Sequence, residues 1–321
     1  MIFEPQAVLR ERIAAVTRRD APPQVQLWED TSDFMTISAG DVLRLGGSDY
    51  LVTGQAREGR FGIDDQPKFW VKIALDLTNG ARKIIKMVFR ETFDSRIGDA
   101  VFHCVRSPEK EAAVLRQMSG HSGFMQGQPV CDTAGNLVRV IDFIYGPSLY
   151  AYLRRQKSTH AAYFQETFPQ VMPRLLESIA AIAQLHRQGL QHGDIRADHL
   201  ILNHDSGDYT WIDFDYAVDR PDYDVFCLGN VLQQAVGQGR HSIDDIRRRP
   251  GDYPLLQGEL TSGDMSLMFR HRVINLRKLF PYIPEALNRI LMRFAAGSTD
   301  PYTRVDDLLT DLRILFPAPG D

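Results

Sequence analysis

The sequence predicts an α+β fold with a small, antiparallel β-rich lobe followed by a larger helical lobe. Between about residues 34 and 90, short β-rich runs alternate with tight turns such as GGSD at 46–49 and TNG at 78–80. This pattern indicates a meander of strands rather than alternating strands and helices. Beyond Gly146-Pro147, apolar residues recur at helical spacing. We therefore place the junction between the lobes near residues 144–147.

The N-terminal elements follow from local patterns. Apolar residues at 8, 9, 13 and 16 predict a short helix over 6–19, which the APP sequence at 21–23 ends. Strands are expected at 34–38, 42–45, 50–53, 69–75 and 84–89. Pro108 suits the first position of a helix and predicts one over 108–118, and the apolar run at 138–144 predicts a further strand.

The expected C-terminal helices have broad apolar faces. One covers 171–188 and is followed by Gly189, a residue type common at helix ends. Another begins at Pro284 and ends at Gly297, and the last passes through the leucines at 308, 309, 312 and 315. We divide the chain into an extension at 1–48, an N-lobe at 49–144 and a C-lobe at 145–321.

Composition and charge exclude several classes of function. The 37 basic and 41 acidic side chains leave a net charge of −4, so no general attraction to nucleic acid or an anionic membrane is expected. No run approaches the ~20 apolar residues of a membrane span, and the first residues lack the order of a secretory signal. The 3 dispersed cysteines suit neither a disulfide framework nor a zinc site. We expect a cytoplasmic protein.

The chemistry is concentrated in HGDIRADHLIL at 192–202 and IDFD at 212–215. Phosphoryl transfer from ATP needs a carboxylate that orients the attacking hydroxyl, ligands for a metal on the phosphates, and cations that balance charge. Asp194 suits the orienting base, and Arg196 suits contact with the transferring phosphate. Asp213 follows a second apolar run and suits the principal metal ligand.

In these motifs the chain resembles the protein kinase-like superfamily, specifically the bacterial relatives of eukaryotic Ser/Thr protein kinases, over roughly residues 49–316. His192, Asp194, Asp213 and Phe214 match the family's catalytic loop and metal motif. Downstream, DVFCLG at 224–229 resembles the buried helix that supports the catalytic loop, and DPYTR at 300–304 resembles the terminal subdomain. The resemblance implies a protein kinase-like two-lobed fold.

The resemblance extends to the expected N-lobe. KIIK at 83–86 resembles the third-strand motif that ends in the phosphate-binding lysine, which makes Lys86 the candidate and Lys83 its competitor. Glu111 matches the helix glutamate that pairs with this lysine, and Glu109 is the alternative.

Two further segments resemble nucleotide-binding parts of the family. GRFG at 59–62 resembles the second half of the glycine-rich loop, which implies that Gly59, Phe61 and Gly62 contact ATP. IDFIYG at 141–146 resembles the gatekeeper and hinge, which implies that the backbone at Asp142 and Ile144 reads adenine.

The chain also departs from the family's pattern. His199 stands at the position of the family's metal-binding asparagine. As a ligand, an imidazole suits Mn²⁺ or Zn²⁺ better than Mg²⁺. The alternative is a hydrogen-bonded structural histidine. Asp215 replaces a glycine and either supplies a metal ligand or caps the turn. Gly193 replaces the arginine that pairs with a phosphorylated activation loop. Asp224 follows Asp213 by only eleven residues, which leaves no room for the usual activation and peptide-binding segment.

The residues and the resemblance together imply an ATP-dependent phosphotransferase that uses Mg²⁺ or Mn²⁺. Lys86 would hold the phosphates, Glu111 would fix Lys86, and Asp213, assisted by His199 and Asp215, would bind the metal. A protein Ser/Thr hydroxyl is the default acceptor, and a small-molecule or sugar hydroxyl follows closely because the peptide platform is missing. The departures also motivate an alternative, a pseudokinase that acts as a nucleotide-binding or interaction module.

Overall fold

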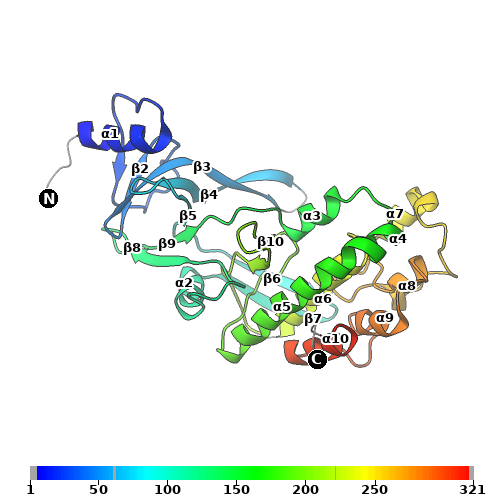
Figure 1. Ribbon diagram of the computed structural model, residues 1–321. Coiled ribbons are helices and arrows are strands. Elements are labelled where there is room, and N and C mark those ends of the chain that lie inside the picture. Colours follow the sequence, from blue (N-terminus) through cyan, green and yellow to red (C-terminus); the bar gives the residue numbers. More distant parts are fainter. Residues whose placement is uncertain (1–5, 61–62, 221, 318–321) are drawn as a thin grey trace. The chain divides into compact units, whose positions relative to one another are not determined.

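The computed structural model describes residues 6–60, 63–220 and 222–317 (Figure 1). The chain forms two compact units. Unit 1 comprises Met1–Glu91, Arg106–His121 and Met125–Phe143, and unit 2 comprises Thr92–Val105, Ser122–Phe124 and Ile144–Asp321. The predicted α+β class is confirmed, since an antiparallel-rich sheet dominates unit 1 and helices dominate unit 2.

Unit 1 is built on a curled sheet with the strand order β1-β2-β3-β4-β5-β9-β8 (Figure 1). β1 runs parallel to β2, and the other neighbours pair antiparallel, so β2 to β5 form the expected meander. In chain order its elements are α1 (Gln6–Thr17), β1 (Leu27–Trp28), β2 (Val42–Leu45), β3 (Ser48–Arg60), β4 (Ile63–Asp76), β5 (Arg82–Lys86), α2 (Pro108–Gln117), β8 (Gly127–Cys131) and β9 (Leu137–Asp142).

The segment before β2 contributes to the hydrophobic core on both faces of this sheet. Leu9 and Ile13 of α1 pack in one cluster with Val42, while Ile37 packs in another with Leu43. Successive side chains of a strand point to opposite faces, so the neighbours Val42 and Leu43 assign the two clusters to opposite faces of the sheet.

The strand expected at 34–38 is wrong, because these residues form turns. The carbonyl of Asp33 accepts a hydrogen bond from the N–H of Thr36 at 3.2 Å. The carboxylate of Asp41 accepts one from the N–H of Ser38 at 2.9 Å. Such local bonds compete with sheet pairing, so Ile37 reaches the core from a loop.

Helix α2 begins as its sequence predicts. The Ser107 hydroxyl accepts a hydrogen bond from the N–H of Lys110 at 3.1 Å. Pro108 occupies the first turn, where a missing N–H costs nothing. The cap sets the start of the helix and thereby the face on which Glu111 is buried.

Unit 2 is mainly helical. Its helices are α3 (Leu149–Arg155), α4 (His160–Ala162), a π-helical segment (Tyr163–Thr167), α5 (Phe168–Arg187), α6 (Asp222–Val236), α7 (Ile243–Arg248), α8 (Leu276–Leu279), α9 (Glu285–Met292) and α10 (Val305–Leu315). Its strands are β6 (Thr92–Ile97), β7 (Ala100–Arg106), β10 (Leu200–Leu202), β11 (Tyr209–Trp211) and β12 (Tyr216–Val218).

Close packing around α6 depends on one glycine. A Cβ at Gly229 would lie 2.3 Å from a ring carbon of Phe294, so any larger residue would force the ring away. Helix α9, expected to end at Gly297, ends at Met292. The N–H of Phe294 donates to the carbonyl of Leu291 at 2.9 Å. This bond spans three residues, as in a 3₁₀-helix, and replaces the four-residue spacing of the α-helix.

The hairpin of β6 and β7 has no counterpart among the expected elements. It lies between β5 and α2 in the chain, yet β7 pairs with β12 in a sheet of order β12-β7-β6. Phe102 is fully buried, with its ring centroid 5.1 Å from that of Tyr223. The Arg220 guanidinium lies 4.9 Å from the Phe102 ring, and the N–H of His103 donates to the Asp219 carboxylate at 3.2 Å. The hairpin thus pairs with residues 216–218 of β12 and contacts the two residues that follow.

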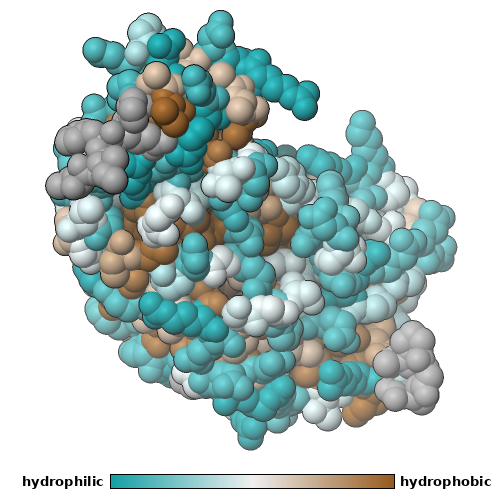
Figure 2. Space-filling model, turned by 60° about the vertical axis from the view of Figure 1, so that its left-hand side comes forward, coloured by the Kyte–Doolittle hydropathy of each residue, from teal (hydrophilic) through white to brown (hydrophobic). Residues whose placement is uncertain are grey.

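The face drawn in Figure 2 is mostly hydrophilic, with apolar residues exposed between the polar ones. Large apolar side chains that are exposed include Met35, Phe69 and Tyr145. Within the described ranges, no helix combines the length and apolarity that a membrane crossing requires.

Candidate active site

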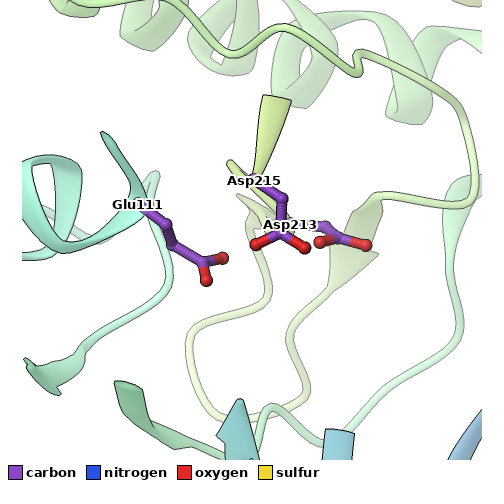
Figure 3. Close-up of side chains that lie close together, drawn as sticks. All are labelled: Glu111, Asp213 and Asp215. Atoms are coloured by element: carbon purple, nitrogen blue, oxygen red, sulfur yellow. The ribbon is translucent and has the colours of Figure 1, made fainter. Parts of the chain in front are cut away.

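In unit 1, Glu111 joins two buried cations. Its carboxylate, labelled in Figure 3, accepts hydrogen bonds from Lys86 Nζ at 2.6 Å and from Arg139 Nε at 3.1 Å. Lys86 on β5 and Arg139 on β9 are paired residues of neighbouring strands, so their side chains share one face of the sheet. Arg139 also donates to the carbonyls of Met87 and Leu137 at 3.2 and 3.0 Å. The cluster restricts Lys86 to one position.

The two competing residues are engaged elsewhere. Lys83 forms an ion pair with Asp142 at 2.5 Å, and Glu109 pairs with Arg90 at 2.5 Å on the exposed surface. Lys86 and Glu111 are both buried, and they contact each other. The structure therefore brings Lys86 and Glu111 together as a buried pair, and phosphate binding by Lys86 stays a prediction.

An Arg139→Met variant is expected to lower the free energy of unfolding by about 1–3 kcal/mol, because buried acceptors lose their donor. Urea unfolding followed by circular dichroism measures this change. Arg90→Met is the matched control, since Arg90 pairs with a glutamate at the surface and such pairs contribute about 0–1 kcal/mol. Equal stabilities of the two variants would contradict a structural role for Arg139.

The residues expected to contact adenine, and those expected to form the glycine-rich loop, lie in different parts of the structure. Asp142 is the last residue of β9, and Ile144 is the first residue of the C-terminal part of unit 2. Gly59 lies near the end of β3. Phe61 and Gly62 lie outside the described residues. Nucleotide contacts from these residues stay predictions.

In unit 2, Asp224 organises the segment that leads to Asp194. Its carboxylate on α6 is fully buried and accepts hydrogen bonds from the N–H groups of His192 and Gly193 at 2.7 and 2.8 Å. The ring Nε2 of His186 lies 2.9 Å from the same carboxylate. Gly193 has φ of +80°, a backbone conformation that favours glycine. This conformation gives a physical reason for the glycine before Asp194.

His199 lies between Asp194 and Asp213. Its Nδ1 is 2.8 Å from the backbone carbonyl of Asp194, and a carbonyl only accepts, so Nδ1 carries a proton. The opposite nitrogen, Nε2, is 3.6 Å from a carboxylate oxygen of Asp213. In the neutral ring this Nε2 presents a lone pair toward a carboxylate, an arrangement that a cation stabilises. The two groups form a nitrogen and oxygen donor pair.

The residues that follow β11 carry the second part of the site. Asp213 has φ of +68°, which is a strained conformation for a residue with a side chain. Such strained residues are concentrated at functional sites. The buried Phe214 ring lies 4.3 Å from the His192 ring. Asp215 is also buried, and one of its oxygens lies within 4.8 Å of an Asp213 oxygen (Figure 3). Neighbouring buried carboxylates suit a divalent cation.

Arg196 forms an ion pair with Asp198, with Nε donating to Oδ1 at 3.0 Å. Burial raises the pKa of Asp198, but the positive charge of His199 in its protonated form and the hydrogen bond and charge of Arg196 outweigh this effect and lower the pKa to about 2. Asp198 is therefore ionised at neutral pH and holds the guanidinium in place.

The sequence analysis missed Arg139, His186 and Asp198 as parts of these clusters. Asp198 lies within the HGDIRADH segment and carried a local signal, and Arg139 is a charged residue inside an otherwise apolar run. His186 carried no signal, because its partner Asp224 lies 38 residues away.

The chain has an antiparallel-rich unit with a buried lysine–glutamate pair and a helical unit with aspartates next to strands. This architecture is compatible with a kinase-like two-lobed fold. No family model matches the chain. Over 160 residues the chain is 23% identical to the sperm motility kinase Tcr mutant form of Mus musculus. The match covers 49% of this chain and 29% of that protein, and it supports a distant kinase-like relationship.

Proposed function

We propose that the chain is an ATP-dependent phosphotransferase of the protein kinase-like class. The arrangement of Asp194, His199 and Asp213 carries the proposal, because it combines a candidate base with a nitrogen and oxygen donor pair at 3.6 Å. The distant similarity to a mouse kinase supports the same class. The acceptor is a hydroxyl, of a protein Ser or Thr by default and otherwise of a sugar or another small molecule.

Each cluster has a separate task in this proposal. A divalent metal bound with ATP neutralises negative charge on the phosphates, and Asp213 and His199, with Asp215 nearby, would hold it. Asp194 would orient the acceptor hydroxyl and accept its proton, as a positioned carboxylate does in phosphoryl transfer. Lys86, held by Glu111, would bind the phosphates of ATP.

ATP with Mn²⁺ is expected to stabilise the protein more than ATP with Mg²⁺, because an imidazole ligand favours Mn²⁺. The unfolding temperature measures this effect, since a ligand that binds only the native state stabilises it by about 2.7 kcal/mol at one hundred times its Kd. Electron paramagnetic resonance of free Mn²⁺ measures metal binding without any turnover. A His199→Asn variant is expected to shift the preference toward Mg²⁺.

The control for the metal preference is Asp205→Asn, which changes an exposed aspartate in the turn between β10 and β11. This variant is expected to show the metal preference of the wild type.

Asp213→Ala is expected to abolish metal-dependent ATP hydrolysis. A protein that is not stabilised by any nucleotide and metal pair would contradict the proposal and favour the interaction module.

A further inference from the structure

A cavity of about 380 Å³ lies in unit 1 between the segment before β2 and the strands β3 and β4. Lys72 of β4 is among its lining residues. In the sheet Lys72 pairs with Ile85, whereas Lys86 pairs with Val71. Paired residues share a face and successive residues alternate, so Lys72 and Lys86 project from opposite faces. The cavity is therefore separate from the cluster around Lys86.

Lys72 carries a buried charge that has no direct partner among the described residues. Only 2% of the residue is exposed, and within the described ranges the ammonium has neither a hydrogen-bond nor an ion-pair partner. The charge of Asp41 acts on it from a distance, but the Asp41 carboxylate already accepts hydrogen bonds from Trp28 Nε1 at 3.0 Å and from the N–H of Ser38 at 2.9 Å. Burial lowers the pKa of Lys72 and outweighs the opposing effect of Asp41.

The remaining lining of the cavity combines apolar and polar residues. Met35 and Phe69 are 56% and 36% exposed, far more than most large apolar residues of the chain, and both line this one cavity. Ile37 and Val52 line it as well, and both are buried. Ser38 and Gln55 add polar groups to the lining. Apolar side chains with a small number of polar groups are the common composition of a small-molecule site, and the volume falls within the usual range of about 300–1,000 Å³.

We propose that this cavity binds a small organic monocarboxylate, with its apolar body against Met35 and Phe69 and its carboxylate on Lys72. The charges favour a monoanion, because Lys72 is the one basic residue among the described residues of the lining. A phosphate dianion is better matched by several cations or by the planar fork of an arginine. The carboxylate would supply the partner that the buried ammonium lacks.

Isothermal titration calorimetry with sodium octanoate tests the proposal without any nucleotide, so it is independent of the phosphotransferase activity. We expect octanoate to bind the wild type, and Lys72→Met to weaken binding about ten- to a hundredfold, the effect of losing a charge-assisted hydrogen bond. 1-Octanol, which has the same chain and no charge, is expected to bind both proteins equally. Lys72→Arg, which keeps the charge, is expected to retain octanoate binding.

Two variants serve as further controls. Lys157→Met removes an exposed lysine of unit 2 and is expected to leave octanoate binding unchanged. Phe69→Ala removes part of the apolar rim and is expected to weaken the binding of octanoate and of octanol. The proposal is overturned if octanoate does not bind the wild type, or if it binds the wild type and Lys72→Met with equal affinity. Methionine keeps the aliphatic stem of Lys72, so we expect the fold to be retained, which circular dichroism checks.

Discussion

An Asp194→Asn variant is expected to lower the rate of phosphate transfer from ATP by about 10²- to 10⁴-fold, the usual contribution of a positioned general base. Asparagine keeps the size of the side chain but cannot accept the proton of the attacking hydroxyl. The contact of His199 Nδ1 with the backbone carbonyl of residue 194 does not depend on the side chain, so the local fold is expected to remain. The initial rate of ADP release in the presence of Mn²⁺ measures the effect.

Nucleotide binding separates this role from a structural one. The Asp194→Asn variant is expected to bind ATP and metal as the wild type does, as judged by its unfolding temperature with ligand. Asp205→Asn, in an exposed turn, is expected to keep the full rate. Equal rates for the Asp194 variant and the wild type would rule out Asp194 as the base.

Asp224→Ala is expected to lower the free energy of unfolding by about 3–5 kcal/mol, the range observed when a buried charged partner is removed. The substitution leaves the buried N–H groups of His192 and Gly193 and the ring of His186 without their acceptor. Each unsatisfied buried donor costs about 1–3 kcal/mol. Urea unfolding followed by circular dichroism measures the loss.

Two further variants test whether the carboxylate itself is responsible. Asp222→Ala removes another acidic residue from the first turn of α6, where Asp222 pairs with the half-exposed Arg220, and is expected to cost about 0–1 kcal/mol. Asp224→Asn keeps one acceptor oxygen, so its loss in the free energy of unfolding is expected to lie between those of Asp222→Ala and Asp224→Ala. A loss for Asp224→Ala no greater than that for Asp222→Ala would contradict the role assigned to Asp224.

Much of the fold was predictable because its signals are local. Ser107 and Pro108 set the start of α2 within three residues of sequence, and Gly189 adopts the left-handed φ of +74° just beyond α5. The strand at 42–45 was predicted with its exact bounds, since its apolar residues lie between turn residues. The candidate site residues were predicted from the order of motifs along the chain, which is also information contained in the sequence.

The rest depends on partners that are far apart in sequence. β6 reads TFDSRI, a mixture of polar and apolar residues, and its hairpin becomes part of a larger sheet only through β12. Arg139 is buried only because Glu111, 28 residues earlier, neutralises it. At 34–38 the aspartates on either side form turns, which a count of apolar residues does not detect.

The hairpin also constrains how the chain folds during its synthesis. Phe102 is covered by Tyr223 and Phe226, which are translated more than one hundred residues later. At about 5–20 residues per second, the nascent hairpin waits roughly 6–24 seconds with an apolar side chain and a strand edge exposed. Contacts of such sequence separation also slow folding. The ribosome-bound chain therefore exposes this apolar side chain until its partners have been made, and slower translation beyond residue 106 would lengthen that period.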